Sequence, residues 1–257
     1  MSALARRRPV GTSIAGDTIM SIPRSPNPIR LCVEDPDPRR LASEPQANLF
    51  KVRLANTEER QSAASYLIQR RYAWRGYAID EQPRPAPSRI TIAAHDEAGT
   101  AGTVTVGLDS GDALFVDGLY REEANALRRQ GRRLAEFTRL AIDNNVHSKQ
   151  LLAALFHVAF IYARRIHGCT DLLIEVNPRH QSFYRRMLGF EALGSMRADP
   201  RVGAPALLLR LCLDYAKQEI GRLGGNPNLG ATTRSLYPYA FAGREEVLIE
   251  RRLRALG

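Results

Sequence analysis

An apolar segment enclosed by two strand-like segments constrains the fold of this chain more than any other feature. Residues 149–167 have helical spacing and are apolar on almost every side, so they predict a buried helix. The segment 134–143 predicts a strand before this helix, and the apolar run 172–176 predicts a buried strand after it. A helix without a polar face needs neighbours on all sides, which a sheet with further helices supplies. These segments therefore predict an α/β domain.

Further segments add antiparallel strands and shorter helices. Residues 89–95 and 102–107 are strand-like and are joined by a short polar turn, which predicts a hairpin. Strands are also predicted over 48–55, 190–193 and 207–213, and helices over 57–76, 120–130, 181–188, from 214 and over 244–254. This order is typical of one domain with a mixed, mostly antiparallel sheet flanked by helices.

The sequence divides into an arm, a domain and a tail. Residues 1–47 contain seven prolines and no aromatic residue, which predicts a flexible arm. The domain is expected over 48–225. Residues 226–257 form a tail with an aromatic cluster at 236–241, which either packs on the core or covers an apolar site. The absence of GxGxxG and GxxxxGK[ST] motifs leaves Rossmann-type and P-loop nucleotide binding without support.

The charge of the chain is strongly basic. It has 37 Lys and Arg residues against 27 Asp and Glu residues, a net charge of +10. Most of the basic residues are arginine, which indicates either a coding bias or a surface that binds carboxylates or phosphates. A basic nucleic-acid-binding protein is the alternative from another functional class. Against it, the sequence has no helix-turn-helix, RNA-recognition or zinc signature, and its arginines are spread over many elements.

The sequence predicts neither a metal site nor a membrane span. Cys32, Cys169 and Cys212 are far apart and form no CxxC pair, and no two histidines have the spacing of metal ligands. No apolar run approaches about 18 residues. The residues after the basic cluster at 6–8 are too polar for an export signal, so a cytoplasmic protein is expected.

The segment 177–190, NPRHQSFYRRMLGF, follows the predicted buried strand. It resembles the C-terminal half of N-acyltransferases of the GNAT superfamily. The resemblance implies a single GNAT-like domain. In that fold the two parallel strands on either side of the buried helix splay apart, and the acyl thioester enters between them.

Two further segments narrow the resemblance. Acetyl-CoA enzymes of this superfamily use a glycine-containing loop before the buried helix to bind the pyrophosphate, but residues 144–150 contain no glycine. The strand Glu136-Phe137-Thr138-Arg139-Leu140 is similar to the Glu-x-x-Arg strand of acyl-homoserine-lactone synthases and FeeM-type N-acyl amino acid synthases. Arg71-Tyr72 and Gly76-Tyr77 match their substrate-cavity segment. Ile68 and Thr105 stand where lactone synthases carry arginines, which favours the FeeM-type branch.

This resemblance implies an N-acyltransferase that moves a medium- or long-chain acyl group from an acidic acyl carrier protein to the amine of an amino acid or similar small molecule. No permanently bound cofactor is expected. An acyl-CoA-dependent GNAT acetyltransferase and an acyl-homoserine-lactone synthase remain as alternatives. The acyl length, the acceptor, the oligomeric state and a peripheral membrane contact of the product stay open.

The resemblance also implies roles for individual residues. Glu136 would accept the proton of the attacking amine, the alternative being an ion pair with Arg139 or Arg133. Tyr184 would protonate the leaving thiolate, with core packing as the alternative. No cysteine is placed for a covalent acyl-enzyme. Substrate contacts are expected from Tyr72, Tyr77, Phe137, Arg139 and Asn177, and docking of the carrier protein near the mouth of the acyl site from Arg70, Arg71, Arg75, Arg128, Arg129, Arg132 and Arg133.

Overall fold

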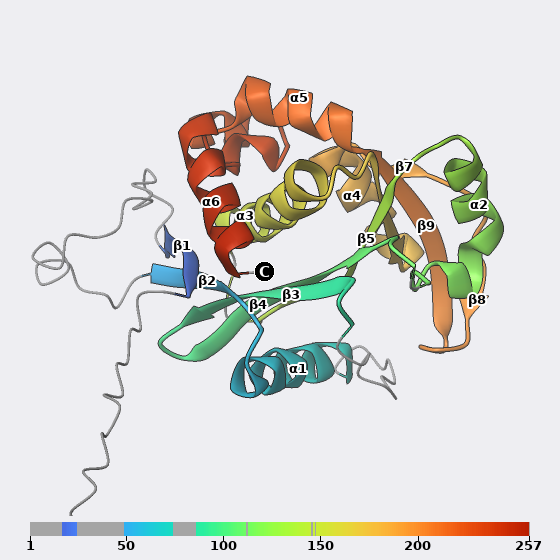
Figure 1. Ribbon diagram of the computed structural model, residues 1–257, viewed down its shortest axis with the longest axis horizontal. Helices are drawn as coiled ribbons and strands as arrows, with labels where there is room; N and C mark the ends of the chain where they lie inside the picture. Colours follow the sequence, from blue (N-terminus) through green and yellow to red (C-terminus); the bar gives the residue numbers. More distant parts are fainter. Residues whose placement is uncertain are drawn as a thin grey trace, which may run out of the picture.

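The computed structural model describes residues 17–24, 49–73, 86–111, 113–144, 146 and 148–256. Within these residues a nine-stranded sheet has the order β1-β2-β3-β4-β5-β6-β9-β7, and β8 pairs with β9 (Figure 1). The strands are β1 Thr18–Pro23, β2 Leu49–Leu54, β3 Arg89–Asp96, β4 Gly99–Leu108, β5 Leu134–Ile142, β6 Asp171–Val176, β7 Glu191–Ala192, β8 Arg197–Asp199 and β9 Ala204–Cys212.

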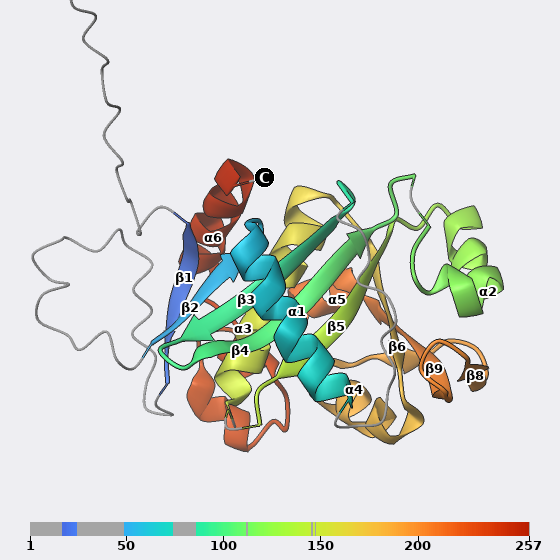
Figure 2. The ribbon, with the colours of Figure 1, turned by 90° about the horizontal axis from the view of Figure 1, so that it is seen from below.

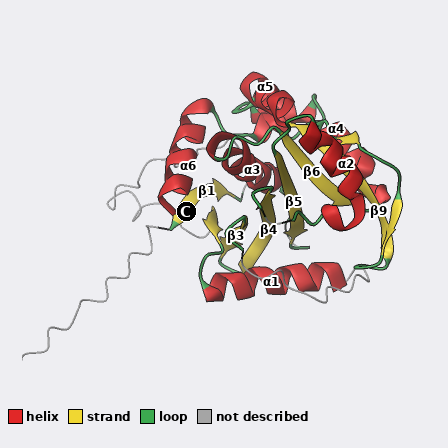
Figure 3. Ribbon diagram, turned by 45° about the vertical axis from the view of Figure 1, so that its right-hand side comes forward, coloured by secondary structure: helices red, strands yellow, loops and turns green. Residues whose placement is uncertain are grey.

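Helices cover both faces of this sheet. Helix α1 crosses the strands β3 to β5 on one face, and α3 lies on the other face together with α5 and α6 (Figure 1, Figure 2). Figure 3 shows α1 and α3 on opposite sides of the strands. The helices are α1 Glu58–Ala73, α2 Asp117–Arg129, α3 Lys149–Phe160 with its π-helical continuation Ile161–Ile166, α4 Gln181–Leu188, α5 Leu213–Leu223 and α6 Gly243–Leu256, and short 3-10 turns are Pro178–His180, Pro227–Ala231 and Tyr237–Tyr239.

The buried helix predicted from the sequence is α3, and it forms the centre of the core. Leu151, Leu155 and Val158 have no exposed surface. The neighbouring faces of β3, β4 and β5, together with α5 and α6, supply the apolar cover that a helix without a polar face needs. The described part of the chain contains no helix that is both long and apolar enough to cross a membrane.

The predicted mixed sheet is confirmed, with every neighbouring strand pair antiparallel except β5 and β6. The structure differs from the prediction at residues 18–23, which lie within the predicted arm. They form the edge strand β1, because Ile19, Met20 and Ile22 are buried beside β2. The short strand β8 was not predicted either. The rest of the arm lies outside the described residues.

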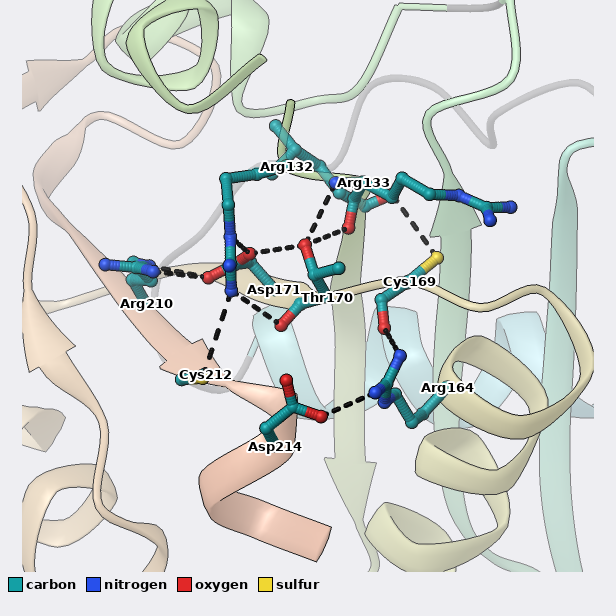
Figure 4. Close-up of polar contacts among 10 residues, drawn as sticks. Arg132, Arg133, Arg164, Cys169, Thr170, Asp171, Arg210, Cys212 and Asp214 are labelled. Carbon is teal, nitrogen blue, oxygen red and sulfur yellow. Dashed lines mark hydrogen bonds and ion pairs between the residues drawn. The ribbon is translucent and has the colours of Figure 1, made fainter. Parts of the chain in front are cut away.

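Strands β5 and β6 are fastened together at their N-terminal ends by a buried carboxylate. Asp171 begins β6 and has no exposed surface. Its Oδ1 accepts from Nε of Arg210 at 2.7 Å, and its Oδ2 accepts from Thr170 Oγ1 at 2.6 Å and pairs with Arg132, which precedes β5 (Figure 4). Burial would raise the pKa of this carboxyl, but the hydrogen bonds from Arg132, Thr170 and Arg210 hold it below its usual value.

Removing this carboxylate should destabilise the protein strongly. Asp171→Asn leaves Arg132 and Arg210 facing each other without the buried charge, and we expect the free energy of unfolding in urea to fall by about 3 kcal/mol. Because the folded pKa is lowered, the contribution of Asp171 is complete above the unfolded value of about 4 and is lost as pH falls further. The difference between the wild type and the variant should therefore shrink in acid.

Asp214→Asn is the matched control. Asp214 pairs with Arg164 in the same region, but its side chain is 53% exposed (Figure 4). Such a pair contributes about 1 kcal/mol or less. Equal losses of stability in the two variants would contradict the role given to Asp171.

Candidate active site

The parallel strands β5 and β6 pair only at their beginnings. Their ladder contains the pairs Leu134↔Asp171, Ala135↔Leu172 and Glu136↔Leu173. Strand β5 continues to Ile142 and β6 to Val176 without further pairing between them. We call these unpaired parts, residues 137–142 and 174–176, the splay. The backbone N–H and C=O groups on the facing edges of the splay take no part in the β5–β6 ladder. They can therefore form hydrogen bonds with a ligand that binds between the strands.

A β-bulge lies within the splay. Between the pairs Thr105↔Thr138 and Thr103↔Ala141, β5 has one residue more than β4, and Arg139 takes a positive φ of 54°. Thr103 Oγ1 donates to the Arg139 carbonyl at 3.0 Å and so supports the bulge. A bulge interrupts the ladder and redirects side chains and backbone groups. Preorganised backbone donors at such a place can stabilise the negative oxygen of a tetrahedral intermediate.

Glu136 is the last β5 residue that pairs with β6, and it is fully buried. Its side chain points toward the face that carries α1 and lies against Gly107 of β4. A Cβ atom on Gly107 would come within 2.8 Å of Glu136 Oε1. Oε2 of Glu136 accepts the backbone N–H of Val116 at 3.2 Å, and Oε1 lies 3.3 Å from Nη2 of Arg89. Burial raises the pKa of this carboxyl in spite of these partners.

The ion-pair partner of Glu136 is therefore Arg89, rather than Arg139 or Arg133. Arg89 also donates to the Ala113 carbonyl at 2.9 Å, and its guanidinium lies 4.3 Å from the centre of the Phe115 ring. These contacts tie the loop before α2 to the start of the splay.

The predicted substrate residue Arg139 lies close enough to Arg89 and to the predicted Tyr72 to interact electrostatically with both. Tyr72 packs beside Ala141 at the end of α1. Burial and the charge of Arg89 lower the pKa of the Arg139 guanidinium, whereas the interaction with Tyr72 raises it. Arg89, Arg139 and Glu136 thus give the splay a polar side, which carries groups of both charges. Such an arrangement can bind a molecule that has both an ammonium and a carboxylate group. Tyr77 lies outside the described residues.

A second carboxylate, Glu175 of β6, lies on the same face as Glu136 and was missed in the sequence. Leu173 belongs to the α2-facing core, and alternation places Glu175 on that side, beyond the last pair with β5. Its Oε2 pairs with Nη2 of Arg201, whereas Oε1 is buried without a hydrogen-bond partner among the described residues. A charged residue within the apolar run 172–176 was the signal that could have singled it out.

The environment of Glu175 raises the pKa of its carboxyl toward neutral pH. Burial raises the pKa of its carboxyl to about 7, against the lowering effect of Arg201, and the charges of Asp199 and Glu136 raise it further. A carboxyl with such a pKa can exchange a proton near neutral pH.

An apolar cavity of about 40 Å³ lies on the opposite face of the sheet. Phe137, the first β5 residue of the splay, lines this cavity with Leu172 of β6, so the predicted substrate residue Phe137 faces it. Its other walls come from α3, β9, α5 and the tail: Ala153, Phe156, His157, Phe160, Leu188, Leu211, Leu213, Ala216, Ile220, Leu236, Tyr237 and Ala240. The tail therefore both packs on the core and covers an apolar site.

His157 of α3 fastens this tail. The backbone N–H of Phe241 donates to His157 Nδ1 at 2.9 Å, and the two rings stack with 5.0 Å between their centres. His157 Nε2 lies 2.8 Å from Oε1 of Glu246 in α6. Because Nδ1 accepts a hydrogen bond, the ring proton belongs on Nε2, which donates to Glu246.

Tyr184 and Asn177 have structural partners. The Tyr184 ring packs edge-on against Phe156, Phe183 and Phe190. Asn177 caps the turn after β6, where its Oδ1 accepts the N–H of Arg179 at 3.2 Å. The ring contacts of Tyr184 fit the packing alternative for that residue, and the predicted roles of both residues in substrate chemistry stay predictions.

The arginines predicted to dock a carrier protein do not share one face, which corrects that prediction. Arg70 and Arg71, in the last turn of α1, bond to Asp143 and Asn144 at the end of β5 where the splay opens. Arg128, Arg129, Arg132 and Arg133 precede β5 and lie about 30 Å away, the length of that strand. There Arg128 pairs with Asp109 and Asp117, and Arg132 with Asp171. Arg75 lies outside the described residues.

The described cysteines offer no nucleophile at the splay. Cys169 is buried, and burial raises the pKa of its thiol to about 11. Cys212 lies opposite Asp171, at the other end of β6 from the splay. The described residues also contain no group of three His, Cys, Asp or Glu side chains that could hold a metal ion.

The chain is similar to a known family and to several solved structures. The family model described as N-acyl amino acid synthase FeeM matches residues 63–212. The solved structure of FeeM, an N-acyl amino acid synthase from uncultured soil microbes, is 28% identical with a TM-score of 0.61, over 66% of this chain and 94% of that chain. An acyl-CoA N-acyltransferase from Pseudomonas aeruginosa is 14% identical with a TM-score of 0.45, over 63% and 97%. The AHL synthase LasI is 12% identical with a TM-score of 0.48, over 64% and 90%. No curated protein sequence matches.

Protonation of His157 should loosen the tail. Burial lowers the pKa of His157 more than Glu246 raises it, so the folded protein keeps a neutral ring at pH values where the unfolded chain is protonated. The free energy of unfolding should therefore fall as pH drops below about 6.5. His157→Gln should be less stable at pH 8 and should lose part of this pH dependence. His180→Gln, in the turn after β6, is the control, and an unchanged slope in His157→Gln would contradict the assignment.

Proposed function

Because the chain belongs to the FeeM family of N-acyl amino acid synthases, we propose that it transfers a medium- or long-chain acyl group from an acyl carrier protein to the amine of an amino acid or a similar small molecule. The observation that carries this proposal is the splay. One side of the splay carries groups of both charges, Arg89, Arg139 and Glu136. The other side is apolar and begins at Phe137. A thioester carbonyl between the strands would have the amine on one side and the acyl chain on the other.

The chemistry is a direct acyl transfer. The substrate ammonium gives one proton to a carboxylate, and the nitrogen lone pair then forms a bond to the thioester carbon. The tetrahedral intermediate collapses as the C–S bond breaks, and the thiolate takes the second nitrogen proton. The products are an amide, a thiol and one proton. Arg139 would bind the carboxylate of the amino acid.

The start of α3 favours a carrier protein as donor. Residues 144–150 contain no glycine, and the Ser148 side chain already accepts the N–H of Leu151 at 3.1 Å. One of the amides that a pyrophosphate would use is thus occupied. A carrier-protein donor also fits a cytoplasmic reaction.

The size of the apolar cavity favours a second candidate. A cavity of about 40 Å³ is far below the ~150 Å³ that accommodates benzene, so it has no room for a long chain without movement. A short acyl group from acyl-CoA would fit with less change. For a medium or long chain, the covering tail at Leu236 and Tyr237 must move.

A product assay distinguishes these donors. The protein is incubated with mixed amino acids and with acyl groups of two to sixteen carbons, each supplied on carrier protein and on CoA. We expect N-acyl amino acids, detected by mass spectrometry, from chains of about twelve carbons or more on the carrier. S-adenosylmethionine in place of amino acids tests for a lactone synthase. Product from acetyl-CoA alone, or no product at all, would contradict the proposal.

Charge reversal locates the docking surface. Arg70→Glu or Arg71→Glu, where the splay opens, should raise the KM for the acidic carrier protein by roughly three- to tenfold at low salt. The control is Arg129→Glu, an exposed arginine at the other end of β5. If Arg129→Glu has the larger effect, the carrier docks at the opposite end.

A further inference from the structure

Glu136 is poorly placed to receive a proton from a substrate. Both of its oxygens have partners, Val116 N–H and the Arg89 guanidinium, and the residue has no exposed surface. Its position is tight as well, since Gly107 of β4 leaves no room for a Cβ atom beside the Glu136 side chain. Glu136 is therefore suited to hold Arg89 and the loop before α2 in place.

Glu175 differs from Glu136 in each of these respects. It stands beyond the last β5–β6 pair, where β6 has no β5 partner. One oxygen is fixed by Arg201, and the other is buried without a partner among the described residues. A buried acceptor without a donor is unfavourable, and an amine entering the splay from the polar side would supply the missing donor.

The anchoring of Glu175 explains how this oxygen is aimed. Arg201 is held by Asp199 through contacts of 2.8 and 3.0 Å, and its Nη1 donates to the Phe115 carbonyl at 3.0 Å. Phe115 is next to Val116, which bonds to Glu136. One loop thus connects the two carboxylates and fixes both on the same side of the splay.

The geometry points to Glu175 as the catalytic base that takes the proton from the amine, with Glu136 as a positioning residue. This inference rests on the proposed function. The carboxylate of Glu175 accepts one ammonium proton on Oε1, the amine attacks the thioester, and Glu175 later releases the proton to solvent. Its pKa of about 7 lets it perform both steps near neutral pH.

The pH profile of kcat/KM tests this assignment. In the wild type the activity should rise with pH through an apparent pKa near 7. Glu175→Gln should lower kcat/KM by roughly 10²-fold or more and should remove this rise. Glu136→Gln should keep the rise, because its role is to position Arg89, but should move it to lower pH, because the charge of Glu136 contributes to the raised pKa of Glu175.

A second pair of variants keeps the test valid if Glu175→Gln does not fold. Arg201→Gln removes the positive partner of Glu175, so the rise should move to higher pH by about one unit. Arg197→Gln is the control, since Arg197 pairs with Glu123 instead. Its profile should keep the wild-type position.

The outcomes separate the two proposals. No product from the wild type contradicts the proposed function and this inference with it. An active wild type whose pH profile is unchanged in Glu175→Gln or Arg201→Gln contradicts the inference alone. Loss of the rise in Glu136→Gln, but not in Glu175→Gln, assigns the proton to Glu136.

Discussion

Strands β5 and β6 are held together over residues 134–136 and 171–173, where the buried carboxylate of Asp171 joins Arg132 and Arg210 across the N-terminal ends. Beyond this point no ladder connects them. The paired end therefore fixes the point from which the two strands continue without pairing to each other. The β5 bulge at Arg139 lies in this unpaired part, and a bulge bends its strand.

The splay separates two environments that acyl transfer needs. On the face of α3, Phe137 opens onto an apolar cavity, which the tail covers and His157 secures. On the face of α1, Glu136 and Glu175 lie among arginines. In the proposed reaction the amine and the acyl chain would thus approach the same carbonyl from opposite faces of one sheet. Because the family match ends at residue 212, the tail that covers the cavity lies beyond the part shared with the family model.

The layered fold and the central β5–α3–β6 unit could be predicted from the sequence, since the apolar run around Leu151 and the strands beside it have strong periodicity. Strand β1 could not, because its six residues, which end at Pro23, give little pattern and are ordered by packing against β2. The predicted base Glu136 lies at the splay, but its partner Arg89 is 47 residues away and became visible only in three dimensions. The prediction that the docking arginines form one surface was wrong because their sequence positions do not show how far apart they lie. The described arginines of α1 lie at the C-terminal end of β5, and those that precede β5 lie at its other end.

In the proposed reaction the acyl chain of the donor would lie between β5 and β6, on the Phe137 side. A carrier protein loaded with a twelve-carbon chain that ends in a photoreactive diazirine tests it most directly. After irradiation, tandem mass spectrometry should find the label on cavity residues such as Phe137 and Phe156 or on the covering segment at Leu236 and Tyr237. Labelling confined to the surface groove between Arg185 and Tyr215, with none at the cavity, would contradict the claim.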